Sequence, residues 1–236
     1  MKGKEFIVIS LFFSLFYFID GRIRYVIRNG DGDQVLELNT NSNGKQVYKD
    51  SGSGAYKDLG VWDPSNETGW YMAGQRAQPS HGGLSGTIVM VKELRPKDNP
   101  RLLVEPTDFK QVWENRGGLA YDDIGVWEME CPTNYVWLGH ISHGCDGCRW
   151  PKPSWYKTRV RCVHNTMVDE CTLERNPLWT NEGDTANTKA SFWNYDTRVA
   201  NRFSGFYMTR AGSYDEPPNY NRKVYCFKQH EEIEDL

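Results

Sequence analysis

Hydrophobic and polar residues alternate along the chain over short stretches, the period of strands that are buried on one face only. The clearest stretch is Arg159–Val163, which places Val and Cys on one side and two Arg on the other. No segment of about twelve residues or more has the 3.6-residue apolar period of an amphipathic helix. Gly, Pro, Ser and Asp residues separate the stretches, for example at 51–54 and 216–218. The pattern predicts an all-β protein.

The chain repeats itself, with three tryptophans separated by 65 and 66 residues. Ala55–Trp62 and Ala120–Trp127 agree at six of eight positions, and an eroded third copy ends at Trp193. An aromatic residue stands 14 positions before each tryptophan and a glycine 12 positions after it. These marks are Tyr48, Trp113 and Trp179, and Gly74, Gly139 and Gly205. The predicted organisation is a lead-in at 22–47, one domain at 48–230 with repeats 48–112, 113–178 and 179–230, and an acidic tail at 231–236 that we expect to be frayed.

Each repeat is predicted to form a small antiparallel sheet of three or four strands. Because one such sheet cannot bury a face alone, we expect a pseudo-threefold, β-prism-like arrangement whose inner faces meet on an axis; a β-trefoil is the alternative. The repeated tryptophans are then expected to point inwards, and together with the repeated glycines they form the predicted structural core. In the lead-in, Val35 to Leu38 is expected to add an edge strand.

The first 21 residues have the layout of a secretory signal peptide. Lys2 and Lys4 form a basic start, Phe6–Ile19 is almost wholly apolar, and Gly21 offers a small residue near a cleavage point. The apolar run of 14 residues is short for a bilayer, which needs about 20. The sequence therefore predicts secretion to the extracellular space.

An oxidising compartment favours disulfides for the six cysteines. Cys171 and Cys226 bracket the third repeat, so a bond between them would tie its end to its start. The remaining pairs would be Cys131–Cys162 and Cys145–Cys148 among the 15 possible pairings. Asn66 begins the sequon Asn-Glu-Thr and is a predicted glycosylation site on an exposed loop.

Composition supports a folded protein that does not bind nucleic acid. Aromatic residues make up 14% of the chain and charged residues only 25%, which is unlike a disordered protein. The formal net charge of −3 provides no basic footprint for a polyanion.

Three stretches resemble the vacuolar-protein-sorting-sixty-two-type family, which includes plant proteins of unknown function. They are Val61–Leu94, Pro106–Trp113 and Arg159–Cys171, so the resemblance covers most of 48–171 and extends loosely to 228. The resemblance implies no catalytic residues. Related repeat sheets in larger proteins act as adaptor or membrane-targeting modules, and the shape implied is similar to that of β-prism lectins and of targeting modules in pore-forming proteins.

Several motifs suggest chemistry only weakly. His140, His143, Cys145 and Cys148 have zinc-type ligands, but four ligands within nine residues leave the loop little room for a tetrahedron, so a Cys145–Cys148 disulfide is favoured. The segment Asn29–Asp33 lacks the later ligands of a calcium loop and is interpreted as a turn. The segment Gly82–Gly86 lacks the frame of a nucleophile elbow. We therefore expect no catalytic residue, no metal and no cofactor.

One repeated pair of residues suits a ligand. A carboxylate stands near an aromatic ring in two places, Tyr56 with Asp58 and Tyr121 with Asp123. This combination suits a sugar; the alternative is that the acids shape turns.

The preferred function is a secreted, non-enzymatic, lectin-like protein that binds a glycan or a glycoprotein surface. A second hypothesis is a membrane-active or toxin-associated module, with aromatics near Trp70, Trp150 or Trp155 inserting into lipid. A third is an extracellular structural protein; the oligomeric state is left open.

Overall fold

The computed structural model describes residues 24–95, 97, 100–116, 118–145, 153–186, 188–196, 206–217, 223–228 and 231–233. The predicted signal peptide at 1–21 lies outside these residues. Within them the protein is all-β, as predicted, and its two helices, η1 (Ser154–Tyr156) and η2 (Asn165–Met167), are single 3-10 turns.

Three repeated units of the same strand plan make up the fold. Each unit has an inner three-stranded antiparallel sheet, and a separate outer sheet pairs its first strand with its last. The first unit contains β2 (Gln34–Asn41), β3 (Gly44–Lys49), β4 (Gly60–Pro64), β5 (Tyr71–Met72), β6 (Arg76–Gln78) and β7 (Ile88–Glu93). The second contains β8 (Leu103–Val104), β9 (Asp108–Asn115), β10 (Asp123–Glu130), β11 (Tyr135–Val136), β12 (Ile141–Cys145) and β13 (Cys162–His164). The third contains β14 (Val168–Cys171), β15 (Trp179–Thr180), β16 (Ala190–Asn194), β17 (Tyr207–Ala211) and β18 (Val224–Phe227).

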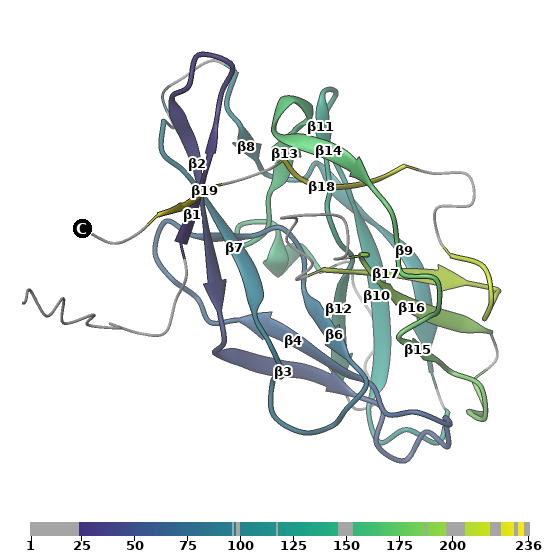
Figure 1. Cartoon of the computed structure of the whole chain (residues 1–236). Coiled ribbons are helices and arrows are strands. Elements are labelled where there is room, and N and C mark those ends of the chain that lie inside the picture. The colour runs from purple at the N-terminus through teal and green to yellow at the C-terminus, as the bar shows by residue number, and fades with distance from the viewer. Residues whose placement is uncertain are drawn as a thin grey trace, which may run out of the picture.

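The inner sheets follow one order in all three units. They are β3-β4-β6, β9-β10-β12 and β15-β16-β17, so the repeated tryptophan always lies on the middle strand. The outer sheets are equally regular, because β7 joins β5 to β2 and β13 joins β11 to β8, while β18 pairs with β14. This order confirms a pseudo-threefold, β-prism-like arrangement of repeated antiparallel units (Figure 1).

The structural units begin earlier than the sequence repeats suggest. Strands β2, β8 and β14 open the units before residues 48, 113 and 179, because each pairs with a strand at or near the end of its own unit. The segment Val35 to Leu38 is therefore not an edge strand: β2 pairs with β7 on one side and with β1 (Arg24–Arg28) on the other. The acidic tail is not wholly frayed either, because β19 (Glu231–Ile233) pairs with β1, where the yellow end of the chain meets the purple start (Figure 1).

The repeated glycines bring the units together on the pseudo-threefold axis. A Cβ added to Gly74 would lie 2.8 Å from Cδ1 of Phe206 and 3.1 Å from Cα of Gly139. A Cβ on Gly139 would likewise lie 2.8 Å from Cβ of Phe206. The third repeated glycine, Gly205, directly precedes Phe206 and lies outside the described residues. Only a residue without a side chain permits this approach of backbones.

The core around the axis takes equivalent residues from each unit. One buried cluster takes three equivalent residues from each unit. Two of them are aliphatic or aromatic residues on the middle strand or just before it, and the third is the aromatic residue of an inner edge strand. The members that recur in this way are Tyr48, Trp113 and Trp179, Leu59, Ile124 and Ala190, and Val61, Val126 and Phe192.

The repeated tryptophans are buried, but they do not pack together in one cluster. Trp127 packs with Phe109, Met129 and Tyr156, and Trp193 packs in a further cluster that reaches the outer sheets. Their strand neighbours face the axis instead, and successive side chains on a strand point to opposite faces. All three tryptophans, Trp62, Trp127 and Trp193, are at most 8% exposed.

Two predicted disulfides are present. Cys131 is bonded to Cys162, and Cys171 to Cys226, the second bond joining β14 to β18 across the ends of the third unit. Cys148 and the Cys145 side chain lie outside the described residues, so the third predicted pair does as well.

Candidate functional site

Loops from all three units gather at one end of the molecule, at the lower right of Figure 1. They are the described residues of 50–59, 116–122 and 181–189, which connect the first two inner strands of each unit; we call this end the apex. The amide of Tyr56 donates to the carbonyl of Glu182 at 3.0 Å, and the amide of Tyr121 donates to the carbonyl of Ser51 at 2.9 Å. Each of these tyrosines is therefore held on a loop of a neighbouring unit.

The two tyrosine rings lie over glycine backbone. A Cβ added to Gly183 would be 2.9 Å from the Tyr56 ring, and one added to Gly52 would be 3.0 Å from the Tyr121 ring. Both glycines have φ in the left-handed region, at +94° and +82°. The rings are nevertheless 78% and 77% exposed, so the apex presents two fixed aromatic faces to solvent.

Hydrogen bonds between units support the apex from below. The Trp179 indole donates to the carboxylate of Asp50 at 2.9 Å, and the Trp113 indole donates to the hydroxyl of Thr188 at 3.0 Å. The Asn115 amide reaches the carboxylate of Asp184 at 2.6 Å. Because these bonds cross between units, the position of each tyrosine depends on how the units dock.

The carboxylates of the two predicted Tyr–Asp pairs lie in different environments. The Asp58 side chain is 60% exposed, and its Oδ1 lies 3.7 Å from Nδ1 of His81. Asp123 instead begins β10 and is half-buried. The pKa of Tyr48 is raised mainly by burial, and Asp123 together with other acids raises it further. Asp58 is thus the more accessible of the two carboxylates.

Asp50, Asp58 and His81 form a cluster with metal-type ligands, whose ligand atoms lie within 4.8 Å of one another. Nε2 of His81 lies 2.5 Å from Oδ1 of Asp50. That oxygen also accepts from the amide of Leu59 at 2.7 Å, while the other oxygen accepts from Trp179. These donors already use both oxygens of Asp50, so the carboxylate acts as an anchor for the apex.

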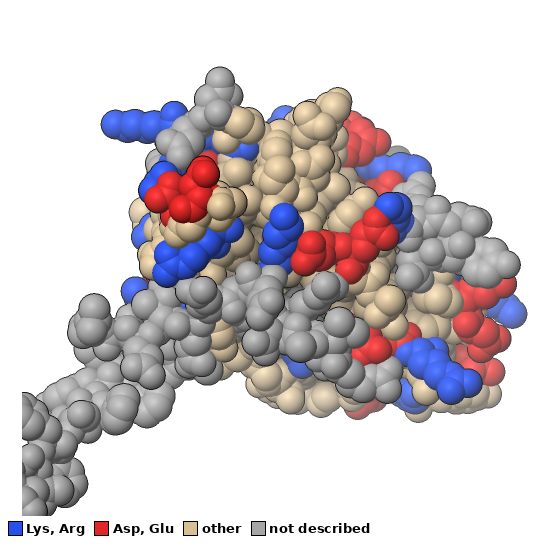
Figure 2. All heavy atoms as spheres, turned by 45° about the horizontal axis from the view of Figure 1, so that its top comes forward, with Lys and Arg blue, Asp and Glu red and all other residues tan. Residues whose placement is uncertain are grey.

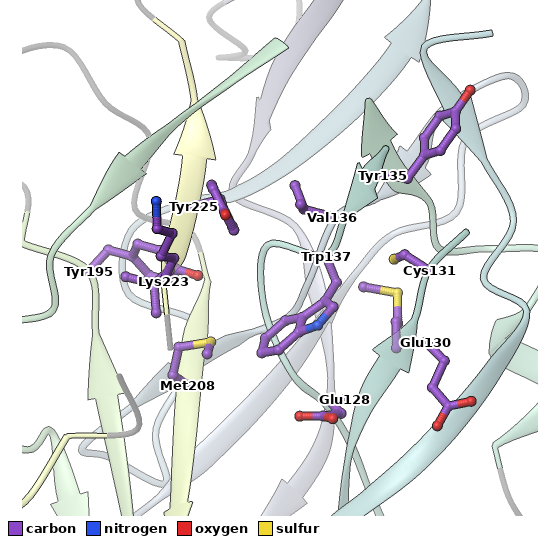
Figure 3. Close-up of a pocket in the computed structure, with 12 residues that line it drawn as sticks. Glu128, Glu130, Cys131, Tyr135, Val136, Trp137, Tyr195, Met208, Lys223 and Tyr225 are labelled. Atoms are coloured by element: carbon purple, nitrogen blue, oxygen red, sulfur yellow. The ribbon is translucent and has the colours of Figure 1, made fainter. Parts of the chain in front are cut away.

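A groove runs between the second and third units and was not predicted from the sequence. One cavity of about 560 Å³ lies between β10 and β11 on one side and β17 and β18 on the other. A smaller hollow of about 280 Å³ adjoins it and shares Glu128, Trp137, Met208 and Lys223. In Figure 3 the Trp137 indole lies between the acidic strand β10 and the side chains of Met208, Lys223 and Tyr225. Trp137 lies two positions before the repeated Gly139, but this position gives no signal for a site.

The histidines of the zinc-type motif point in different directions. The Trp137 ring stacks on His140, with centroids 5.0 Å apart and planes 24° apart. Nδ1 of His140 accepts from the amide of Thr209 at 2.8 Å, which docks the second unit on the third. His143 contacts Trp155 instead, at 5.2 Å between ring centroids, and burial lowers its pKa. Residues three apart near a strand face opposite sides, so the two imidazoles do not form one site.

The other candidate motifs are structural. Asn29 accepts from the amides of Asp31 and Asp33, which closes the turn between β1 and β2. The amide of Ser85 donates to Gln78, so the segment Gly82–Gly86 forms a loop held by a side chain. Asn66 is exposed, as a glycosylated residue must be.

The aromatics proposed for lipid insertion have different environments. Trp70 is only 9% exposed, with the Lys92 ammonium 5.6 Å from its ring centroid, so the expectation that it is exposed is wrong. Trp155 is 43% exposed, and Trp150 lies outside the described residues. In the described part of the chain, no helix has the length and apolar character needed to span a bilayer.

Acidic and basic side chains are interspersed on the face shown in Figure 2. Among the coloured residues of that face, no broad patch of one sign is visible.

Comparison with known proteins identifies the family. Among curated protein sequences, none matches this chain. The solved structures that match include GNIP1Aa from Chromobacterium piscinae, which is 26% identical, with a TM-score of 0.65 over 82% of this chain. The chain corresponds to 37% of the length of that structure. The family model described as vacuolar protein sorting-associated protein 62 matches residues 32–231, that is, both outer and inner sheets of all three units. The chain belongs to the vacuolar protein sorting-associated protein 62 family.

Proposed function

We propose that this protein is a secreted, non-enzymatic recognition protein that binds a glycan or a glycoprotein surface through its apex. The observation that carries the proposal is the pair of exposed, rigidly held rings of Tyr56 and Tyr121 on equivalent loops. A sugar stacks its apolar face on such a ring and offers its hydroxyls to nearby carboxylates, here Asp58 and Asp123.

Rigidity favours affinity at this site. Tyrosine rings that are already fixed lose little conformational freedom on binding, which removes one of the main costs of association. Two equivalent rings on adjacent units also allow two sugar residues of one chain to bind together, and such bivalent contact raises the apparent affinity. The two described disulfides are typical of a protein made in an oxidising compartment and support the secretory part of the proposal.

The test is a glycan array with the chain from about residue 22, run with and without calcium. Selective binding in either condition, lost on Tyr56→Ala/Tyr121→Ala, is the expected result. Since truncating a central aromatic contact costs about 2 kcal/mol or more, affinity should fall by about thirtyfold. Trp155→Ala, which removes an exposed ring that does not belong to the apex loops, is the matched control and should bind as wild type.

A membrane-facing role is the second candidate, because Leu119 is 59% exposed at the same apex. It predicts that liposome co-sedimentation, and not glycan binding, is lost in the tyrosine variants. A blank array together with co-sedimentation that Leu119→Ser abolishes would replace the glycan proposal.

A further inference from the structure

The larger cavity between the second and third units has an unusual lining. Its twelve residues include four aromatic side chains, two methionines, a half-cystine, two carboxylates and one ammonium group. Its volume of about 560 Å³ falls within the range of small-molecule sites. Among the described residues, the lining has no Asn, Gln, Ser, Thr or His, the neutral groups that most often fix a sugar by hydrogen bonds.

Two of the three tyrosine hydroxyls of the lining already donate to backbone carbonyls. The Tyr135 hydroxyl donates to the carbonyl of Arg101 at 2.5 Å, and the Tyr195 hydroxyl donates to the carbonyl of Leu138. Both rings thus contribute aromatic surface while their donors are engaged elsewhere. A ligand of this cavity must be recognised mainly by charge and by aromatic contact.

The charge of the lining favours a cation. Glu128 and Glu130 lie two residues apart on β10 and therefore on one face of the strand. In Figure 3 the Glu128 carboxylate lies beside the Trp137 indole, and Glu130 lies farther from it. The one ammonium of the lining, on Lys223, is paired with the carboxylate of Glu170, which is not among the twelve lining residues. Lys110 lies 3.7 Å from Glu128, and Glu130 adds a second carboxylate at the rim.

Trp137 supplies the aromatic face. One face of the ring packs on His140, and the indole lines both the larger cavity and the smaller hollow. Nδ1 of His140 accepts a hydrogen bond from the amide of Thr209, and an accepting nitrogen carries no proton, so this imidazole is neutral. A neutral support leaves the negative π-face of the indole uncompensated on the cavity side. Tryptophan is the most favourable ring for a cation, ahead of tyrosine and phenylalanine.

We propose that this cavity binds a quaternary ammonium group, such as that of choline or a choline ester. Such a group has no hydrogen-bond donor and is held by aromatic faces and carboxylates, the two features that the lining combines. The site is separate from the apex and does not depend on the glycan proposal. Free choline compounds and choline lipid headgroups share this chemistry.

The test measures choline binding by isothermal titration calorimetry of the secreted chain. The uncharged isostere 3,3-dimethylbutan-1-ol, which has the same shape, is the matched ligand control. Binding of choline that is at least about tenfold tighter than that of the isostere is expected, because the cation–π and carboxylate contacts need the charge. No detectable binding at about 10 mM choline, or equal affinity for both compounds, would overturn the proposal.

Variants locate the site. Glu130→Gln, an exposed carboxylate, should weaken choline binding severalfold without disturbing the fold, and Trp137→Leu should abolish it. If Trp137→Leu is poorly folded, the Glu130→Gln result alone decides. Tyr56→Ala should leave choline binding unchanged, and Glu130→Gln should leave glycan-array binding unchanged, so failure of either proposal is seen separately.

Two further arms distinguish the source of the ammonium group. Soluble phosphocholine and phosphatidylcholine vesicles are titrated in parallel. Binding of phosphocholine alone assigns the cavity to a free ligand, and binding of both assigns it to a lipid headgroup. A response to methyl glycosides that Glu130→Gln removes would show a sugar site in its place and contradict the proposal.

Discussion

At the scale of single residues, the repeated Gly-x-Trp sequence has a steric explanation. The indole folds back over the residue two positions before it, which lies on the same face of the strand. A Cβ on Gly125 would be 2.2 Å from Cη2 of Trp127, and one on Gly60 would be 3.2 Å from Nε1 of Trp62. In the third unit Ser191 replaces the glycine, and its hydroxyl accepts from the Trp193 indole at 2.8 Å. In the third repeat the loss of the glycine is therefore compensated, because the residue in its place forms a hydrogen bond with the indole.

Gly125→Ala should destabilise the protein because the buried Trp127 ring cannot move aside. Overpacking of this kind costs about 1–3 kcal/mol. Chemical denaturation monitored by circular dichroism measures the change. Gly30→Ala, where nothing lies within 4 Å of the added Cβ, is the control and should be neutral. Equal stability of both variants would show that the Trp127 ring does not occupy this position.

At the scale of elements, the outer sheets depend on how the ends of each unit pair. Strands β14 and β18 form a sheet in which each described strand has one partner, so few backbone hydrogen bonds hold them. The Cys171–Cys226 bond spans 55 residues and joins these two strands directly. A covalent link of this length stabilises mainly by restricting the unfolded chain.

Replacing both cysteines, Cys171→Ala/Cys226→Ala, should lower the free energy of unfolding by about 2–4 kcal/mol. Urea titration under non-reducing conditions measures the loss. Adding a reductant to the double variant then reports on the remaining disulfides alone. A double variant as stable as wild type would mean that the strand pairing suffices without the bond.

At the scale of the whole molecule, the three units form one cooperative structure. The largest cluster combines Leu36 from the first unit, Val163 from the second and Trp193 from the third. Gln75, next to the axis, links units through its side chain: its amide donates to the carbonyl of Ser142 at 2.8 Å and to the carboxylate of Asp63 at 2.6 Å. No unit keeps its core when it is separated from the others, so a single unfolding transition is expected.

Gln75→Leu should test this linkage. It removes the donor to Oδ1 of Asp63, whose Oδ2 still accepts from Tyr156 and Arg159, and it removes the side chain that bonds the Ser142 backbone; losses of this kind cost about 1–3 kcal/mol. The expected result is a lower melting temperature that remains a single transition in calorimetry. Gln111→Leu, on the exposed surface of β9, should change stability by less than about 0.5 kcal/mol. Two separate transitions in the variant would show that the units unfold independently.

The sequence by itself determined the class of fold, the three repeats and the two described disulfides. Alternation at period two identifies strands, and the recurrence of Gly74 and Gly139 with the tryptophans identifies units, because both are local properties of the chain. The sequence also singled out Tyr56 and Tyr121, since these residues recur at one position of the repeat.

The tertiary structure alone decided which face each residue takes. Alternation shows that Val126 and Trp127 face opposite sides, but not which side meets the axis, and here the valine does. It also decided that Tyr56 rests on Gly183 and that Trp137 borders a cavity with Lys223, since these residues belong to different units. Contacts between units depend on how whole sheets dock, and no local pattern of residues encodes that geometry.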